Sequence, residues 1–113
     1  MKPRSAKAKG MKFQREVKDK VCQALDIHPE DIVPTTAGVV GVDLRLSRAA
    51  RDKFPFSVEC KHLAKFSIYK IYDQAAANTL EGTVPMAVIK QNRSTPLAVL
   101  KLDDLLEVIA KKQ

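Results

Sequence analysis

The chain has 113 residues, a formal net charge of +7, and a composition that is 45% hydrophobic and 29% charged. This length allows one compact domain and excludes two, and so much apolar content excludes a disordered chain. The sequence has no apolar run of the roughly 18 residues that a membrane span requires, and no apolar segment follows the basic N-terminus as in a secretory signal. Cys22 and Cys60 stand at apolar positions without disulfide or metal-ligand spacing. We therefore expect an intracellular protein whose two thiols are reduced core residues.

Most of the positive charge lies at the N-terminus. Residues 1–20 hold eight basic and two acidic side chains and so carry +6 of the total +7. Residues 1–9 combine Pro3 with small and charged residues, which predicts a flexible basic arm in front of a single domain over residues 10–113. A basic arm attracts polyanions because their condensed counterions are released on binding. A solubilising tail would have the same composition, so the arm suggests nucleic acid without proving it.

The first half of the domain predicts a helix followed by two strands. Apolar residues at helical spacing indicate a helix over residues 10–25. Residues 26–38 contain two prolines and predict a connection. Residues 39–46, VVGVDLRL, predict a strand, and Ser47 is placed to cap a short helical turn after it. In FPFSVECKHL, residues 54–63, apolar side chains alternate as they do in a half-buried strand.

The second half predicts a helix, a pair of strands and a final helix. Ser67 is placed as the N-cap of a helix that ends at Gly82. The segments VPMAVIK and PLAVLKL flank the polar turn QNRST and therefore predict an antiparallel pair. Residues 103–110 predict an amphipathic helix. The element order αββαββα, which leaves out the short turn after Ser47, predicts an α/β domain with a small mixed central sheet flanked by helices.

Three charged side chains are placed to form a site on this sheet. Asp43 lies on the first predicted strand, and Glu59 and Lys61 share one face of the second. If the two strands pair, these side chains converge near the backbone carbonyl of Cys60. Such an all-oxygen donor set suits Mg²⁺, and the lysine can position water or stabilise charge that develops on a phosphate. A solvent-exposed ion pair is the simpler explanation of Glu59 and Lys61 taken alone.

These motifs resemble those of a known family. GVDL followed by FPFSVECKH is similar to the Asp…Glu-x-Lys signature of the PD-(D/E)xK nuclease superfamily, with Asp43 as the aspartate. KGMKFQREVKDKV resembles the first helix of the archaeal Holliday-junction resolvases. FSIYKIYDQAAANTLEGTVPMAVIK resembles their second helix and the strand after it. The block SRAARDKFPFSVECK is similar to small phage-encoded resolvases or endonucleases.

The resemblance implies a restriction-endonuclease-like core and a hydrolytic activity. The family cuts DNA phosphodiester bonds with Mg²⁺, for which we expect Mn²⁺ to substitute. By analogy, Asp43, Glu59 and the backbone carbonyl of Cys60 hold the metal. Lys61 orients the attacking water, and Gln74 on the following helix supports the site.

One position departs from the family pattern. The first helix of the resolvases usually carries a glutamate that helps to hold metal, and this chain has Gln14 there. An amide oxygen can still bind a metal, but it adds no charge, so the resemblance leaves open whether one or two metals bind. The resolvases also have a mobile loop with a hydroxyl residue near the site, and Thr35, Thr36 and Gly38 stand at this place.

We expect DNA to be the partner of this domain. The candidate contacts are basic and polar residues of the arm, the first helix and the QNRST turn: Lys7, Lys9, Lys12, Arg15, Lys90, Asn92 and Arg93. Contacts to the DNA backbone do not read bases, which suits recognition of a branched shape such as a four-way junction. His62 is at best a further contact on the substrate side.

A Holliday-junction resolvase is therefore the first hypothesis, acting in the host cytoplasm if a phage encodes it. Such an enzyme makes two symmetric nicks, so we expect a homodimer. Apolar residues of the second and last helices offer interface surface: Tyr69, Tyr72, Leu105, Leu106 and Ile109. Two alternatives stay open. One is a structure-specific or general duplex endonuclease; the other is a non-catalytic DNA-binding module on the same fold, which the missing glutamate at Gln14 would favour.

Overall fold

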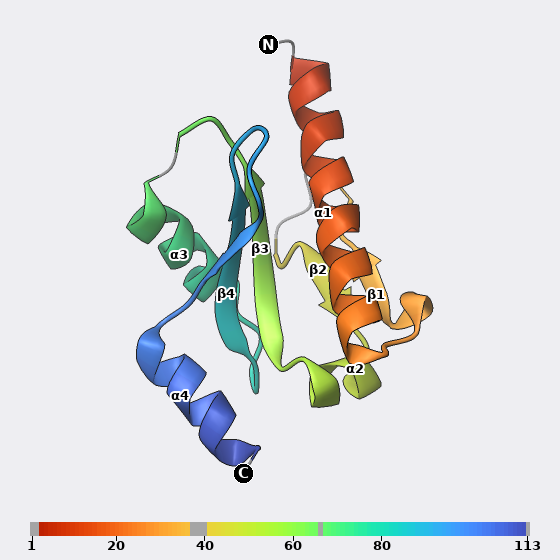
Figure 1. Cartoon of the computed structure of the whole chain (residues 1–113), viewed down its shortest axis with the longest axis vertical. Helices are drawn as coiled ribbons and strands as arrows, with labels where there is room; N and C mark the ends of the chain where they lie inside the picture. The colour runs from red at the N-terminus through yellow and green to blue at the C-terminus, as the bar shows by residue number, and fades with distance from the viewer. Residues whose placement is uncertain (1–2, 37–40, 66, 113) are drawn as a thin grey trace.

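The computed structural model describes residues 3–36, 41–65 and 67–112, with side chains from residue 7 onward. A long helix, α1 (Pro3–Leu25), lies along one side of the molecule (Figure 1). Its 23 residues extend about 34 Å at the usual helical rise. The helix begins at Pro3 and not at Gly10, so residues 3–9, which we expected to form an arm, are its first turns.

The main sheet has three strands and mixed pairing. β3 (Phe56–His62) and β4 (Val84–Lys90) run parallel, with Glu59 opposite Ala87. β5 (Leu97–Val99) pairs antiparallel with β4, so the strand order is β3-β4-β5. The antiparallel pair predicted on either side of QNRST and the mixed character of the sheet are both confirmed.

A second, two-stranded sheet is an addition to the expected order. β1 (Ile32–Pro34) pairs antiparallel with β2 (Leu44–Leu46). β1 follows a 3₁₀ turn, η1 (Pro29–Asp31). The sequence predicted only a connection here because β1 is three residues long and carries Pro34, a residue that normally argues against a strand.

The two strands that were expected to bring the acidic residues together belong to different sheets. β2 keeps only the last three residues of the strand predicted over residues 39–46, of which 39 and 40 lie outside the described part of the chain, as does Gly38. β2 pairs with β1, and β3 has β4 as its ladder partner. The α/β class is thus confirmed, whereas the single central sheet is replaced by two sheets.

Two helices follow β2 and β3 in the chain. The short helix α2 (Arg48–Lys53) begins after Ser47, whose Oγ accepts the N–H of Ala50 at 3.1 Å, so the predicted cap is confirmed. The helix α3 (Ile68–Ala77) begins after Ser67, which makes no side-chain cap hydrogen bond.

α3 ends five residues before the predicted stop at Gly82. Beyond its end, the N–H of Leu80 donates to Ser57 Oγ of β3 at 3.0 Å, and this bond turns the chain toward the sheet. Ser57 Oγ also lies 2.5 Å from Thr83 Oγ1. The Ser57 side chain of β3 thus holds the chain just beyond the end of α3, a contact that a reading of local helical spacing does not include.

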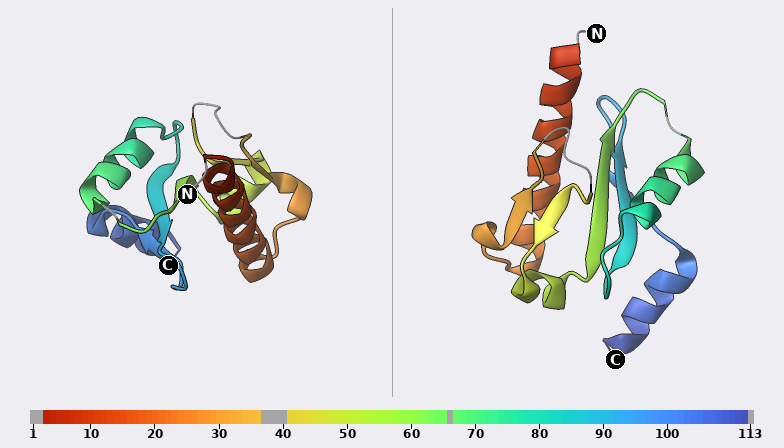
Figure 2. Two further views of the ribbon diagram at one scale, coloured as in Figure 1. Left: turned by 90° about the horizontal axis from the view of Figure 1, so that it is seen from above. Right: turned by 180° about the vertical axis from the view of Figure 1, so that it is seen from behind.

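The last helix, α4 (Leu102–Lys111), has no buried residue and extends away from the sheet (Figures 1 and 2). It starts one residue before the predicted range. Within the described residues, no helix combines the length and apolar character that crossing a bilayer requires.

The main sheet separates two apolar clusters. On one face, Val58 and Cys60 of β3 pack with Phe13 and Val17 of α1. On the other face, Ile71 and Ala75 of α3 pack with Ala87 and Ile89 of β4. Figure 2 shows α1 and α3 on opposite sides of β3 and β4. Because side chains alternate along a strand, the odd-numbered residues of β3 belong to the face that α3 covers.

Candidate active site

β3 places two charged side chains on the α3 face of the sheet. Glu59 is 8% exposed although it is ionisable, whereas the side chain of Lys61 is 35% exposed. Lys61 Nζ lies 3.9 Å from Glu59 Oε2. A carboxyl group is rarely this buried unless it is paired, so the simple explanation of a solvent-exposed ion pair does not fit Glu59.

Asp43 lies immediately before β2 and is attached to the free edge of β3 at two points. Its N–H donates to the carbonyl of Val58 at 2.9 Å. Its Oδ2 accepts the N–H of Cys60 at 2.6 Å. These two bonds bring Asp43 beside Glu59 without the continuous strand pairing that the sequence suggested.

Thr35 holds the Asp43 segment in position through two hydrogen bonds. Its N–H donates to the Asp43 carbonyl at 2.8 Å, and its Oγ1 donates to the Val42 carbonyl at 2.6 Å. Thr35 is 5% exposed, which makes it a buried anchor of this segment, and Thr36 next to it is exposed. Thr35 thus has a structural contact to the segment that carries the candidate metal ligand.

The carbonyl of Cys60 faces the same side as Asp43. Odd-numbered positions bond to the β4 side: Pro55 accepts the N–H of Val84, and Leu63 donates to Lys90. Even-numbered positions present their backbone groups to the opposite edge, where Asp43 lies. A strand residue directs its N–H and its carbonyl to one edge, so the Cys60 carbonyl belongs to the edge of β3 that Asp43 occupies.

These residues line a hollow of about 400 Å³ that we call the Glu59 pocket: Gly41, Asp43, Glu59, Lys61, Gln74, Ala77 and Asn78. The pocket brings together four of the five side chains that the sequence assigned to catalysis. The fifth, Gln14 of α1, is not among the lining residues. Its Oε1 is buried and, within the part of the chain described, has no hydrogen-bond partner.

Asn78 lines the pocket, although no role was predicted for it. Its Nδ2 lies 3.4 Å from Glu59 Oε1 and can donate to it. The signal was present in the sequence, since Asn78 is four residues after Gln74 and thus on the same line of the helix. A polar line beside the apolar face of a helix is equally typical of a half-exposed flank, so the spacing alone did not single out Asn78, which is the C-cap of α3.

The surroundings of Glu59 favour its protonated form. The pKa of Glu59 is raised from 4.5 to about 7, mainly by burial and next by the neighbouring Asp43 carboxyl group. Lys61 and the hydrogen bond from Asn78 lower the pKa of Glu59, but they do not offset the burial. The raised pKa means that ionising Glu59 is unfavourable near neutral pH. A cation bound beside the two carboxyl groups would favour the ionised form.

The donor atoms of the pocket fit a hard divalent cation that is held by few protein ligands. Asp43, Glu59 and the Cys60 carbonyl are oxygen donors of the kind that Mg²⁺ prefers. Among the described residues, no group of three or more His, Cys, Asp or Glu side chains is placed to hold a metal. Mg²⁺ usually keeps several waters and binds one or two carboxylates together with a substrate phosphate, so two carboxylates are enough for it.

The cysteines do not take part in this chemistry as nucleophiles. Cys22 and Cys60 are free and buried, as the sequence predicted. Burial raises the pKa of both thiols, and Asp43 and Glu59 raise that of Cys60 further. Because the thiolate is the reactive form, both residues act as apolar core.

The expected DNA contacts lie mainly outside the Glu59 pocket. Lys7, Lys12 and Arg15 are exposed on α1, and Lys9 is partly exposed. Lys90 ends β4; Asn92 and Arg93 are exposed in the turn before β5. The positive charge thus extends along α1 and the β4–β5 turn.

Comparison with protein-family models, with curated proteins and with solved structures finds no match to this chain.

Proposed function

We propose that this chain is a metal-dependent endonuclease that hydrolyses DNA phosphodiester bonds and, within that class, a Holliday-junction resolvase. The observation that carries the proposal is the meeting of Asp43, Glu59 and Lys61 in one pocket, with Glu59 buried beside a second carboxylate. A strand has no structural need for this combination, because burying a charge costs free energy unless it is paired.

Each pocket residue has a role in this proposal. Asp43, Glu59 and the Cys60 carbonyl would hold Mg²⁺, or Mn²⁺ in its place. When bound, a divalent ion supplies Lewis acidity to the phosphoryl group and makes water a stronger nucleophile. Lys61 orients the attacking water and stabilises negative charge that develops on the phosphate. Asn78 holds Glu59 in position through the contact at 3.4 Å.

The reaction is a hydrolysis and needs no further reactant. A bond forms between the water oxygen and phosphorus, and one phosphorus–oxygen ester bond breaks. The leaving sugar oxygen gains a proton, and the attacking water loses one. Gln74 lines the pocket beside these groups, and its amide can donate a hydrogen bond to a phosphate oxygen or accept one from water.

Cutting a four-way junction symmetrically requires two such sites, so we propose that the protein acts as a homodimer. The apolar surface that supports this idea extends over α3, β5 and α4. A hollow of about 380 Å³ lies there, lined by Tyr69, Tyr72 and Val99 among others. Tyr69 is 84% exposed, and Leu102, Leu105, Leu106 and Ile109 of α4 are also exposed.

Cleavage of an end-labelled four-way junction, beside a linear duplex of the same sequence, tests the proposal. We expect paired symmetric nicks in the junction alone, with Mg²⁺ present and not with EDTA. Metal-dependent cutting of every substrate would keep the nuclease and reject the resolvase. Junction binding without cutting in Mg²⁺ or Mn²⁺ would reject the enzyme and favour a DNA-binding module, for which Gln14→Glu is the next variant to examine.

A further inference from the structure

A second hollow lies on the opposite face of β3 from the Glu59 pocket. It measures about 410 Å³ and is lined by Ala8, Lys9, Lys12, Phe13, Glu16, His62 and Lys90. We call it the His62 pocket. Lys61 and His62 are neighbours in one strand and so point to opposite faces; one lines the Glu59 pocket and the other lines this one.

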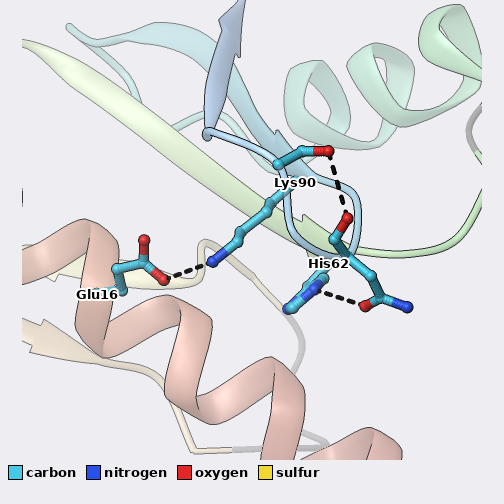
Figure 3. Close-up of polar contacts among 5 residues, drawn as sticks. Glu16, His62 and Lys90 are labelled. Carbon is cyan, nitrogen blue, oxygen red and sulfur yellow. Dashed lines mark hydrogen bonds and ion pairs between the residues drawn. The ribbon is translucent and has the colours of Figure 1, made fainter.

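The charge of the His62 pocket is positive. Three lysines are among its lining residues, with Glu16 as the one acidic residue among them. Glu16 Oε1 forms an ion pair with Lys90 Nζ at 3.2 Å, which joins α1 to the end of β4 (Figure 3). Since this pair accounts for one positive and one negative charge, Lys9 and Lys12 supply the excess.

The wall of the pocket is held in place by contacts that fix the His62 ring. The ring packs edge-on against Phe13, with centroids 5.7 Å apart and planes inclined by 62°. Its Nε2 lies 3.1 Å from Asn92 Oδ1, in the turn that follows β4 (Figure 3). The hollow is therefore concave and basic, and three segments distant in the sequence meet there: α1, the end of β3 and the β4–β5 turn.

We propose that the His62 pocket binds a phosphodiester group of a nucleic-acid backbone, on the face of β3 opposite the Glu59 pocket. This inference rests on the proposed function, because it takes nucleic acid to be the substrate. A phosphate is a compact anion that lysine ammonium groups bind as point charges. Such a contact fixes the position of the nucleic acid and reads no base. A DNA that reaches both pockets passes over the C-terminal end of β3.

DNA binding in EDTA tests this inference apart from cleavage. The dissociation constant of a fluorescent four-way junction is measured by anisotropy between about 50 and 200 mM NaCl, where phosphate contacts give a steep salt dependence. Lys9→Gln/Lys12→Gln should weaken binding about tenfold at the lower salt concentration and reduce the salt slope by about 1. Lys111→Gln/Lys112→Gln removes the same charge at the far end of α4 and should bind like wild type.

Two further measurements locate the contact. His62→Phe keeps an aromatic ring beside Phe13 and removes the polar edge, so it should weaken binding about threefold while its melting temperature stays that of wild type. A neutral methylphosphonate placed at successive backbone positions should weaken wild-type binding at one position and leave the Lys9→Gln/Lys12→Gln variant unaffected there. Equal losses for both proteins at every position would overturn the inference.

The outcomes separate this inference from the proposed function. Pocket variants that keep the wild-type salt slope and still cut DNA would reject the phosphate site and leave the nuclease standing. If the wild-type protein binds DNA through the pocket and never cuts it, the nuclease is rejected and the phosphate site stands. Inorganic phosphate distinguishes the source of the anion: if it shifts the His62 ring signals in NMR spectra and DNA does not, the nucleic-acid ligand is rejected.

Discussion

The Oδ2 atom of Asp43 accepts the backbone N–H of Cys60 at 2.6 Å, so a carboxylate that precedes β2 completes the free edge of β3. This bond, with that from the Asp43 N–H to the Val58 carbonyl, unites two sheets that share no ladder. Asp43 is in this way both a candidate metal ligand and a structural connection.

Asp43→Ala should therefore lose stability as well as cleavage. It leaves the Cys60 N–H without its side-chain acceptor, a loss of about 2 kcal/mol in the free energy of unfolding. Urea unfolding in EDTA measures this loss without the metal. Asp52→Ala, which removes an exposed carboxylate of α2, is the control and should unfold like wild type. Equal unfolding midpoints for the two variants would contradict the structural role of Asp43.

The stability of the metal-free protein should fall as pH rises through the range from about 4.5 to about 7. The pKa of Glu59 is about 7 when folded against an ordinary value of 4.5, so the folded state binds more protons than the unfolded state in this range. Stability is greatest below the unfolded value and decreases until the carboxyl is ionised in both states.

Glu59→Gln should remove this pH dependence. At pH 8 in EDTA the variant should be more stable than wild type by about 3 kcal/mol, since the pKa of Glu59 rises from 4.5 to about 7 on folding and one pKa unit corresponds to about 1.36 kcal/mol. Glu81→Gln, at an exposed position, should follow the wild-type curve. Unfolding curves at pH 5 and pH 8 check both variants, and a Glu59→Gln protein with the wild-type slope would argue against a buried, perturbed carboxyl.

Lys61→Ala should abolish cleavage while DNA binding stays within about twofold of wild type. Lys61 is partly exposed, and its Nζ lies 3.9 Å from Glu59 Oε2, close to the limit of about 4 Å for an ion pair. Its removal leaves the backbone pairing of β3 intact, so the variant should fold normally. Lys70→Ala, an exposed lysine of α3, is the matched control. Cutting by Lys61→Ala at the wild-type rate would remove this residue from catalysis.

Removing residues 1–9 should weaken DNA binding and make its salt dependence less steep by at least about 1 in slope. Because residues 3–9 are helical, the truncated protein should also show less helix by circular dichroism. If the truncated protein loses the helical signal of residues 3–9 but its DNA binding keeps the wild-type salt dependence, these residues do not belong to the DNA-binding surface.

The strand that carries the site could be predicted from sequence because its signal is local. Alternation along FPFSVECKHL separates Val58 and Cys60 from Glu59 and Lys61, and the structure places them on the two faces accordingly. The same holds for the Ser47 cap, where one side chain bonds a nearby N–H.

The parts that the sequence did not predict depend on partners distant in the chain. β1 exists because β2 pairs with it, and Asp43 reaches Glu59 through single hydrogen bonds rather than through a strand ladder. α3 ends at Ala77, and just beyond it the Ser57 side chain of β3 accepts the N–H of Leu80. Helical and strand periodicities contain no information about such contacts, because the partner residues lie outside any local window.

The alternation of β3 also limits how this protein can change. Lys61 serves one hollow and His62 the other, while Val58 and Cys60 fill the core behind them. Inserting or deleting a single residue in β3 before Lys61 would turn every later side chain to the wrong face. Glu59 or Lys61 would then enter the apolar layer under α1. A change in the length of this strand should therefore damage the protein more than a conservative substitution, because it misplaces all the later side chains at once.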